Sequence, residues 1–246
     1  MPLLEVERVC KGFGGVRAVH EVSFALEEGE LVGIMGPNGS GKTTLFNVIA
    51  GALAPDAGHV RLRGREIGGL APHRVCAHGI ARTFQLVRPF AGLTALENVL
   101  VGRLFGRAEA TAAGAAAEAE RLLALVGLEG RAEVPAARLT LMDRKRLELA
   151  RALATSPQLL LLDEFMAGLN PAETATAMAL IRTLVAQGLT VLMVEHIVWA
   201  LMELSKRIIV LSAGEKIAEG PPDAIAADPA VVDVYLGTDR GSAMRA

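Results

Sequence analysis

Apolar residues recur along the chain with two periods, one typical of strands and one typical of helices. The order of the strand and helix segments predicts the fold class. Short apolar runs bounded by turn residues predict strands, and longer segments with helical spacing predict helices. Predicted strands cover residues 3–9, 16–26, 31–35, 59–63, 79–85, 159–162, 189–194, 207–211 and 216–219. Predicted helices cover residues 45–50, 72–77, most of 95–155, 170–186, 197–204, 223–227 and 229–236. Strands that alternate with helices indicate an α/β sheet.

The first strands differ from the rest because short turns join them. We expect this N-terminal part to be antiparallel, with residues 11–15 forming a loop. Phe13 would then stand on a loop just before residues 36–44. Two interpretations of this ring remain open, an aromatic side chain at the edge of the core or a platform on which a base stacks.

The stretch between the predicted strand 31–35 and the helix that follows has the composition of a phosphate-binding loop. It matches glycine, four residues, then Gly-Lys-Thr. Its residues are Gly36, Pro37, Asn38, Gly39, Ser40, Gly41, Lys42, Thr43 and Thr44. Glycines let successive N–H groups converge on an anion, and the helix adds its positive N-terminal end. We expect Lys42 to reach the outer phosphates of a nucleotide and the Thr43 hydroxyl to ligate Mg²⁺.

Two acidic residues follow an entirely apolar strand later in the chain. Four leucines, residues 159–162, lead into Asp163 and Glu164. Such a run is typical of a central parallel strand that is buried on both faces. The carboxyl end of such a strand lies beside the phosphate loop, so Asp163 can hold Mg²⁺ and Glu164 can polarise an attacking water. The alternative is that the acids only mark the end of the strand.

A histidine follows the next buried strand in the same way. His196 comes directly after residues 189–195, at the edge of the sheet where Asp163 is expected. A structural role and a functional role are both open for a single histidine. Asn170, Pro171 and Glu173 predict a capped helix start.

Composition and the N-terminal residues bear on the partners and the compartment of the protein. The chain has 246 residues, of which 52% are apolar, and a net charge of −2, so it has no basic field that would attract nucleic acid. Cys10 and Cys76 form no metal or disulfide pattern, and we expect them to be reduced thiols in a cytosolic protein. The N-terminus has acids where a signal peptide has bases, and no apolar run has the length of a membrane span. We therefore expect a soluble chain, which leaves docking onto a membrane protein open.

Taken in order, these residues resemble an ATP-binding cassette (ABC) ATPase over essentially the whole chain. Seven positions correspond to named motifs of that family. They are the A-loop aromatic (Phe13), Walker A (Gly36–Thr43), the Q-loop (Gln85), the signature (Leu139–Asp143), Walker B (Leu159–Asp163 with Glu164), the D-loop (Ala167–Asn170) and the switch histidine (His196). The resemblance implies a P-loop NTPase with a mixed central sheet and an N-terminal antiparallel β subdomain. It also implies a single cassette, residues 1–246, with an inserted helical subdomain at about 86–156 and a tail at about 220–246.

Three stretches make the chain similar to the ATPase subunits of bacterial branched-chain amino acid importers. They are residues 79–85, 167–173 and 234–237. Related subunits serve urea, short amides and other amino acids, so the cargo stays open. Exporters or lipid-extraction systems, soluble ABC proteins that act on ribosomes or DNA, and non-catalytic ATP binders are the remaining alternatives.

The resemblance also implies a mechanism. Two ATPase subunits close face to face around two ATP, and closure drives two membrane-spanning permease subunits on the inner face of the plasma membrane. Lys42 and the loop amides hold the phosphates, while Thr43, Asp163 and Gln85 surround Mg²⁺. Glu164 is implied as the general base and His196 as a contact of the γ-phosphate. Gln85 and residues 86–100 are expected to face the permease, which receives its cargo from a substrate-binding protein.

The signature departs from the family pattern Leu-Ser-Gly-Gly-Gln. Here the segment is Leu139, Thr140, Leu141, Met142 and Asp143. Thr140 still indicates a capped helix start whose amides can point at the ATP of a partner subunit. Both glycines are absent, and an acid stands near the expected phosphate, which makes close backbone approach harder. The D-loop ends in Asn170 where the family commonly has Asp. We therefore expect this chain to pair with a non-identical ATPase subunit.

Overall fold

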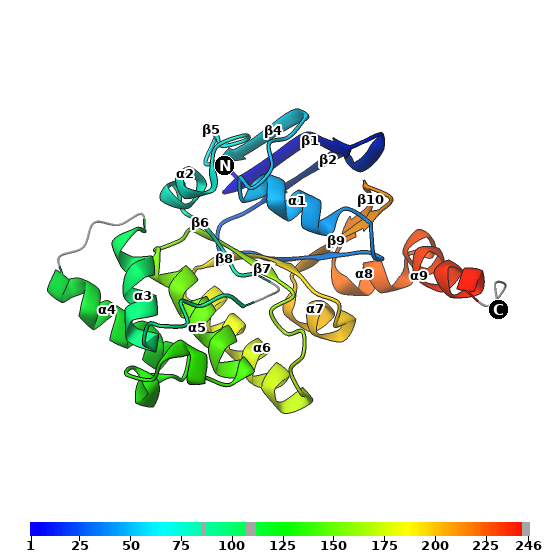
Figure 1. Ribbon diagram of the computed structural model, residues 1–246. Helices are drawn as coiled ribbons and strands as arrows, with labels where there is room; N and C mark the ends of the chain where they lie inside the picture. The colour runs from blue at the N-terminus through cyan, green and yellow to red at the C-terminus, as the bar shows by residue number, and fades with distance from the viewer. Residues whose placement is uncertain (85–86, 107–111, 243–246) are drawn as a thin grey trace.

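The computed structural model describes residues 1–84, 87–106 and 112–242, and two sheets organise it (Figure 1). The antiparallel sheet has the spatial order β2 (Val16–Leu26), β1 (Leu4–Phe13), β4 (Ala57–Leu62) and β5 (Arg65–Glu66). The second sheet has the order β10 (Glu215–Gly220), β9 (Arg207–Ser212), β3 (Leu31–Met35), β8 (Thr190–Val194), β7 (Leu159–Asp163) and β6 (Ile80–Arg82). Its neighbouring strands are parallel except for β10, which is antiparallel to β9. The predicted mixed sheet and antiparallel N-terminal strands are confirmed.

Helices surround the second sheet. They are α1 (Lys42–Ile49), α2 (Pro72–His78), α3 (Ala95–Leu104), α4 (Ala112–Leu125), α5 (Leu141–Ala154), α6 (Pro171–Ala186), α7 (Val198–Leu204), α8 (Pro222–Ala227) and α9 (Pro229–Ser242), with 3₁₀ turns at Glu129–Arg131 and Ala136–Arg138. Figure 1 shows α1 between the two sheets and α5, α6 and α7 on the other face of the second sheet. In the described part of the chain, no helix combines the length and the apolar character needed to cross a membrane.

The central strands are apolar because both of their faces are buried. In β7, Leu159 and Leu161 pack in the core that contains α1 and the antiparallel sheet. Leu160 and Leu162 pack in the other core, with α5 and α6. Successive side chains of a strand point to opposite faces, so a strand between two cores needs an apolar residue at every position.

The structure corrects the prediction of a loop at residues 11–15. β1 continues through Phe13, because Lys11, Gly12 and Phe13 pair with residues of β2. Only Gly14 and Gly15 remain for the turn, and both have positive φ, 51° and 91°. Phe13 is therefore the last residue of a strand. The strand predicted at 79–85 is also shorter, since β6 pairs with β7 only over Ile80–Arg82.

Candidate active site

The turn between β3 and α1 is built so that only glycine fits at its two ends. Gly36 has φ 154° and Gly41 has φ 100°. A Cβ atom on Gly36 would lie 2.1 Å from the Leu211 carbonyl oxygen, and one on Gly41 would lie 2.2 Å from the Ala18 carbonyl oxygen. The backbone thus lies against β9 at Gly36 and against β2 at Gly41, and neither position has room for a side chain.

Helix α1 begins without a side-chain cap. Gly41 occupies the cap position, and the first turn holds no acidic residue. By contrast, α3 and α6 both start with a full capping box, formed at α6 by Asn170 and Glu173 as the sequence indicates. The first N–H groups of a helix need an acceptor, and at α1 no side chain of the cap residue supplies it. An anion can take that place.

Lys42 lies inside the loop that precedes it. Its Nζ donates to the carbonyl oxygens of Gly36, at 2.7 Å, and Pro37, at 2.9 Å. Burial lowers the pKa of Lys42, while the negative charges of Glu164 and Asp163 act in the opposite direction. The ammonium group therefore interacts electrostatically with Asp163, the last residue of β7, and with Glu164, the residue after it. In the same loop Ser40 is buried and its Oγ has no partner within the described residues, whereas Thr43 is exposed.

Asp163 stands at the carboxyl end of β7 and is 4% exposed. Its Oδ2 lies 2.6 Å from Nη2 of Arg82, the last residue of β6. Nη1 of the same guanidinium donates to Oδ1 of Asn47 on α1, also at 2.6 Å. Asp163 is thus tied, through one arginine, to the helix that follows the phosphate loop.

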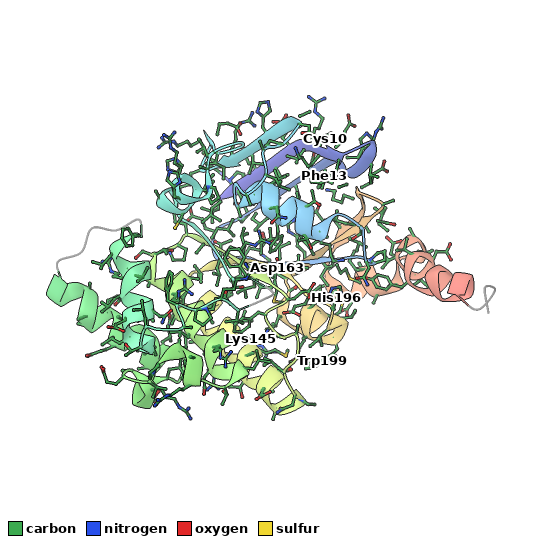
Figure 2. All side chains as sticks on the ribbon, in the orientation of Figure 1. Cys10, Phe13, Lys145, Asp163, His196 and Trp199 are labelled. Carbon is green, nitrogen blue, oxygen red and sulfur yellow. The ribbon has the colours of Figure 1, made fainter. Side chains whose placement is uncertain are left out.

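Glu164 and His196 meet at the same edge of the sheet. His196 Nε2 lies 2.8 Å from Glu164 Oε1, and because an ionised carboxylate only accepts, Nε2 is the donor. Glu164 has the left-handed φ of 50°, and its N–H donates to the Val194 carbonyl oxygen at 2.9 Å. The carboxyl ends of β7 and β8 therefore bring together two residues that lie 32 positions apart in the chain. Figure 2 marks Asp163 and His196 in this region.

A buried polar layer behind these residues was not predicted from the sequence. Lys145 of α5 is 4% exposed, and its Nζ donates to the Phe165 carbonyl oxygen at 2.8 Å. Glu195 Oε1 accepts from the Met166 N–H at 2.8 Å, and burial raises the pKa of Glu195 to about 7. Both contacts fix the backbone just after Glu164. A polar residue on the buried face of α5, three positions after Met142, is the signal that could have revealed Lys145.

Glu148 extends the same layer toward the Q-loop position. It lies three residues after Lys145 on α5, and its Oε1 accepts from the Phe84 N–H at 2.9 Å. Burial raises the pKa of Glu148 to about 7, although the Phe84 N–H and the charges of Arg151 and Lys145 act in the opposite direction. Gln85, expected as a Mg²⁺ contact, lies outside the described residues.

Phe13 has the exposure that a stacking platform needs. The ring is 48% exposed, and the Lys11 ammonium lies 5.7 Å from its centroid. A ring at the core edge would be covered more fully. The geometry therefore favours the stacking interpretation, which remains a prediction.

The signature segment, residues 139–143, starts helix α5. The Thr140 side chain caps the helix by accepting from the Asp143 N–H at 3.2 Å, as the sequence indicates. Leu141 is 51% exposed, and Met142 is buried. The Asp143 carboxylate lies 3.3 Å from Arg131 and 4.0 Å from Arg146. Its charge is therefore balanced by arginines of its own subunit.

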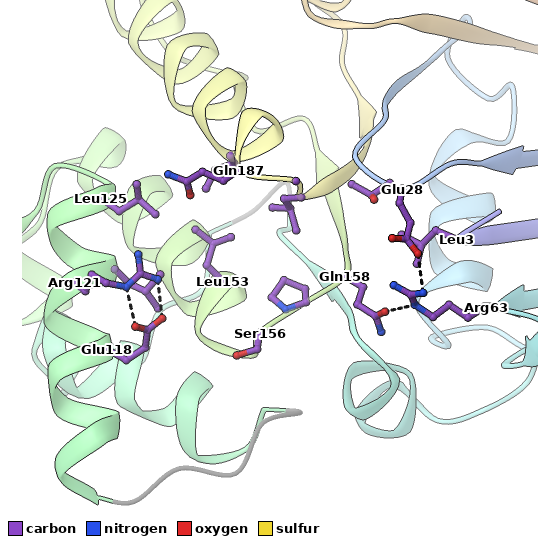
Figure 3. Close-up of a pocket in the computed structure, with 16 residues that line it drawn as sticks. Leu3, Glu28, Arg63, Glu118, Arg121, Leu125, Leu153, Ser156, Gln158 and Gln187 are labelled. Carbon is purple, nitrogen blue, oxygen red and sulfur yellow. Dashed lines mark hydrogen bonds and ion pairs between the residues drawn. The ribbon is translucent and has the colours of Figure 1, made fainter. Parts of the chain in front are cut away.

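A cavity of about 400 Å³ lies away from these residues (Figure 3). Gln158, just before β7, and Thr190, at the start of β8, line it. These positions are at the amino ends of the parallel strands, opposite the edge that carries Asp163 and His196. Its charged groups pair with one another, Arg121 with Glu118 and Arg63 with Glu28. The cavity is thus separate from the candidate active site.

Comparison with protein families gives a match to the ABC transporter family model over residues 19–167. This chain belongs to the ATP-binding subunits of ABC transporters. The model described as branched-chain amino acid ATP-binding cassette transporter matches residues 215–240 of this ABC ATPase.

Curated relatives match along nearly the whole ABC ATPase. The high-affinity branched-chain amino acid transport ATP-binding protein BraF of Pseudomonas aeruginosa is 40% identical, with 96% of this chain and 98% of the relative covered. LivG of Salmonella typhimurium, a protein of the same description, is also 40% identical, with the same coverage.

Solved structures confirm the fold. One is an ATP-binding cassette of an ABC transporter in its ADP conformation, with a TM-score of 0.87, 31% identity, and coverage of 96% of this chain and 99% of that one. A dimeric bacterial ABC transporter cassette has a TM-score of 0.80, 29% identity, and coverage of 89% and 98%. The predicted P-loop NTPase fold and the assignment as a nucleotide-binding ATPase are therefore both correct.

Proposed function

We propose that this ATPase powers the uptake of branched-chain amino acids through two membrane permease subunits, from the inner face of the plasma membrane. The similarity to BraF and LivG over 96% of the chain supports the class of cargo. The observation that supports hydrolysis is the 2.8 Å contact of His196 with Glu164, directly after Asp163. In this proposal Glu164 is the base and His196 is the group that positions it.

Residues 36–44 would hold the phosphates of ATP. The uncapped start of α1 and the Lys42 ammonium both suit an anion, and the exposed ring of Phe13 suits the adenine. The Thr43 hydroxyl and the Asp163 carboxylate are hard oxygen donors, which is the chemistry that Mg²⁺ prefers. Gln85 would complete this set. Bound Mg²⁺ would neutralise charge that develops on the phosphate oxygens during the reaction.

Glu164 would act as the general base. Its carboxylate takes a proton from water as the water oxygen attacks the γ-phosphorus, and the bond from that phosphorus to the β,γ-bridging oxygen breaks to give ADP and phosphate. His196 would hold Glu164 through Nε2 and contact the γ-phosphate. Lys145 and the Val194 carbonyl oxygen fix the backbone around Glu164, which keeps the base in place.

The signature segment would complete the ATP site of a second ATPase subunit that is not identical to this one. Leu141 and Met142 bring side chains to the start of α5, where the family pattern has glycines. A homodimer would place this segment at both sites, whereas in a heterodimer the partner's signature would complete the site of this chain. The proposal fails if purified complexes contain only this ATPase and hydrolyse ATP at full rate.

Reconstitution tests the cargo. The subunit is copurified with its membrane partners, placed in proteoliposomes, and its ATPase activity is measured with a panel of binding proteins loaded with leucine, isoleucine, valine, urea or a short amide. Stimulation by the branched-chain amino acids is expected. Stimulation by urea or amides alone would contradict the proposed cargo while leaving the ATPase assignment intact.

A further inference from the structure

A single arginine connects the hydrolytic half-site, by which we mean residues 36–44 with Asp163, Glu164 and His196, to the part of α1 that follows the phosphate loop. Arg82 ends β6, and its side chain is 9% exposed. One terminal nitrogen lies 2.6 Å from Asp163 Oδ2, and the other lies 2.6 Å from Asn47 Oδ1. The two prongs of the guanidinium thus connect β7 with α1.

Two aromatic rings hold the guanidinium in this orientation. Its central carbon lies 5.9 Å from the centroid of the buried Phe46 ring and 5.3 Å from that of Phe84. A guanidinium beside aromatic faces and forked between two oxygens has little freedom to rotate. The Asp163 carboxylate therefore accepts from a guanidinium whose orientation is restricted. The ion pair occupies one carboxylate oxygen, Oδ2, and leaves Oδ1 for other contacts.

We propose that Arg82 is a positioning residue that orients the Asp163 carboxylate for the metal ion bound with the nucleotide. This inference rests on the Mg²⁺ role of Asp163 proposed above. Carboxylates that ligate metals are themselves hydrogen-bonded, and loss of such an outer partner typically costs about 10- to 100-fold in metal affinity or activity. The charge-assisted bond to Arg82 supplies that outer contact.

Metal binding to the full chain tests the inference directly. Mn²⁺ is the probe, and its free signal in electron paramagnetic resonance is titrated against the protein with ADP, with Mn²⁺–ADP alone as the blank. Arg82→Gln should weaken Mn²⁺ binding about 10-fold or more. Arg82→Lys keeps the charge but lacks the fork, so it should restore only part of the affinity.

Three further variants separate positioning from folding. Asn47→Ala removes one support of the guanidinium and should weaken Mn²⁺ binding less than Arg82→Gln. Arg207→Gln is the matched control. Arg207 pairs with Glu30 at 2.8 Å at the start of β9, where the amino ends of the parallel strands lie, far from the carboxyl ends that carry Asp163. This variant should lower the melting temperature and leave Mn²⁺ affinity unchanged. Asp163→Asn should weaken Mn²⁺ binding most.

The outcomes distinguish two failures. If Asp163→Asn leaves Mn²⁺ binding unchanged, the proposed metal role fails and the inference fails with it. If Asp163→Asn weakens binding while Arg82→Gln and Asn47→Ala bind Mn²⁺ like the wild type, only the positioning role of Arg82 is overturned. If Arg82→Gln does not fold, the Mn²⁺ affinities of Arg82→Lys and Asn47→Ala are compared with that of the wild type in its place. Wild-type affinity in both would overturn the positioning role of Arg82.

Discussion

In the hydrolytic half-site the acids and the histidine with proposed roles stand at the ends of buried strands, whereas the residues of the signature segment lie at the exposed start of one helix. Asp163 and Glu164 are 4% and 8% exposed, while Leu141 is 51% exposed. The first region is held in place by paired polar groups within this subunit. The second presents an apolar side chain where the family pattern has glycine. One subunit thus combines two buried acids, each hydrogen-bonded within this subunit, with a signature segment that departs from the family pattern.

Helix α5 connects the two regions. Thr140 caps its start, and further along Lys145 bonds the backbone after Glu164 while Glu148 bonds the Phe84 N–H. These contacts would therefore transmit a movement of the signature segment to the backbone beside the hydrolytic half-site. Each end of α5 can be substituted without changing the other end, so the two regions can be tested separately.

The largest effect is expected at the hydrolytic end. His196→Ala removes the donor to Glu164 and should lower the ATP turnover of the assembled transporter about 100-fold, with little change in nucleotide affinity. His73→Ala, on the exposed start of α2, is the control. Turnover in His196→Ala within twofold of the control would remove His196 from the reaction.

Glu148→Gln should change how stability depends on pH. The pKa of Glu148 rises from 4.5 to about 7 on folding, so only the folded state holds the proton between these values. The free energy of unfolding therefore falls as pH rises through this window, by about 3 kcal/mol at most from this group. Glutamine keeps the acceptor for the Phe84 N–H but cannot ionise.

Urea unfolding at pH 5 and pH 8 measures this difference. The wild type should lose more stability than Glu148→Gln between the two pH values, and part of the slope should remain because Glu195 has a similarly raised pKa, about 7. Glu203→Gln is the control, since Glu203 is exposed and pairs with Arg182. Equal slopes in wild type and Glu148→Gln would show that Glu148 is not buried as described.

Thr140→Ala tests the capped start of the signature helix. Loss of an N-cap costs about 1 kcal/mol, which in a chain of this size lowers the melting temperature by roughly 2–4 °C. Thr140→Ser keeps the hydroxyl and should melt like the wild type. A melting temperature in Thr140→Ala equal to that of the wild type would contradict the capping role.

Leu141→Gly tests whether the leucine side chain of the signature segment limits hydrolysis. It restores glycine at an exposed position, at a helix cost of about 1 kcal/mol or less. If the leucine side chain limits approach to the partner's ATP, turnover of the assembled transporter should rise a few-fold. Turnover that stays the same or falls would show that the altered signature does not limit hydrolysis. Leu141→Ala, which keeps a Cβ, is the matched comparison.

The spacing of residues along the sequence was sufficient to predict where residues at strand ends lie in the fold. Asp163 and His196 were placed correctly at one edge because the carboxyl ends of parallel strands must share an edge. Arg82, Lys145 and Glu195 were missed, since their contacts depend on which neighbours each element packs against. Spacing along one strand or helix does not contain that information.

The signature and the first strand show two further limits. The family resemblance leads us to expect Asp143 near a partner's phosphate, which stays a prediction. The ion pair of Asp143 with Arg131 was missed, because Arg131 belongs to a 3₁₀ turn whose position no periodicity reveals. Glycines at 12, 14 and 15 favour a loop locally, but pairing with β2 carries β1 on to Phe13. In β1, tertiary pairing therefore overrides a local preference.

We propose that Glu164 is the base for the ATP bound to this chain's own phosphate loop. The most direct test is the ATP turnover of the reconstituted transporter with Glu164→Gln in this subunit alone, beside Glu203→Gln as control, and with ATP binding measured in parallel. With Glu164 as the base, turnover should fall at least about 100-fold while ATP binding is retained. Turnover within twofold of the control, with ATP bound, would contradict it.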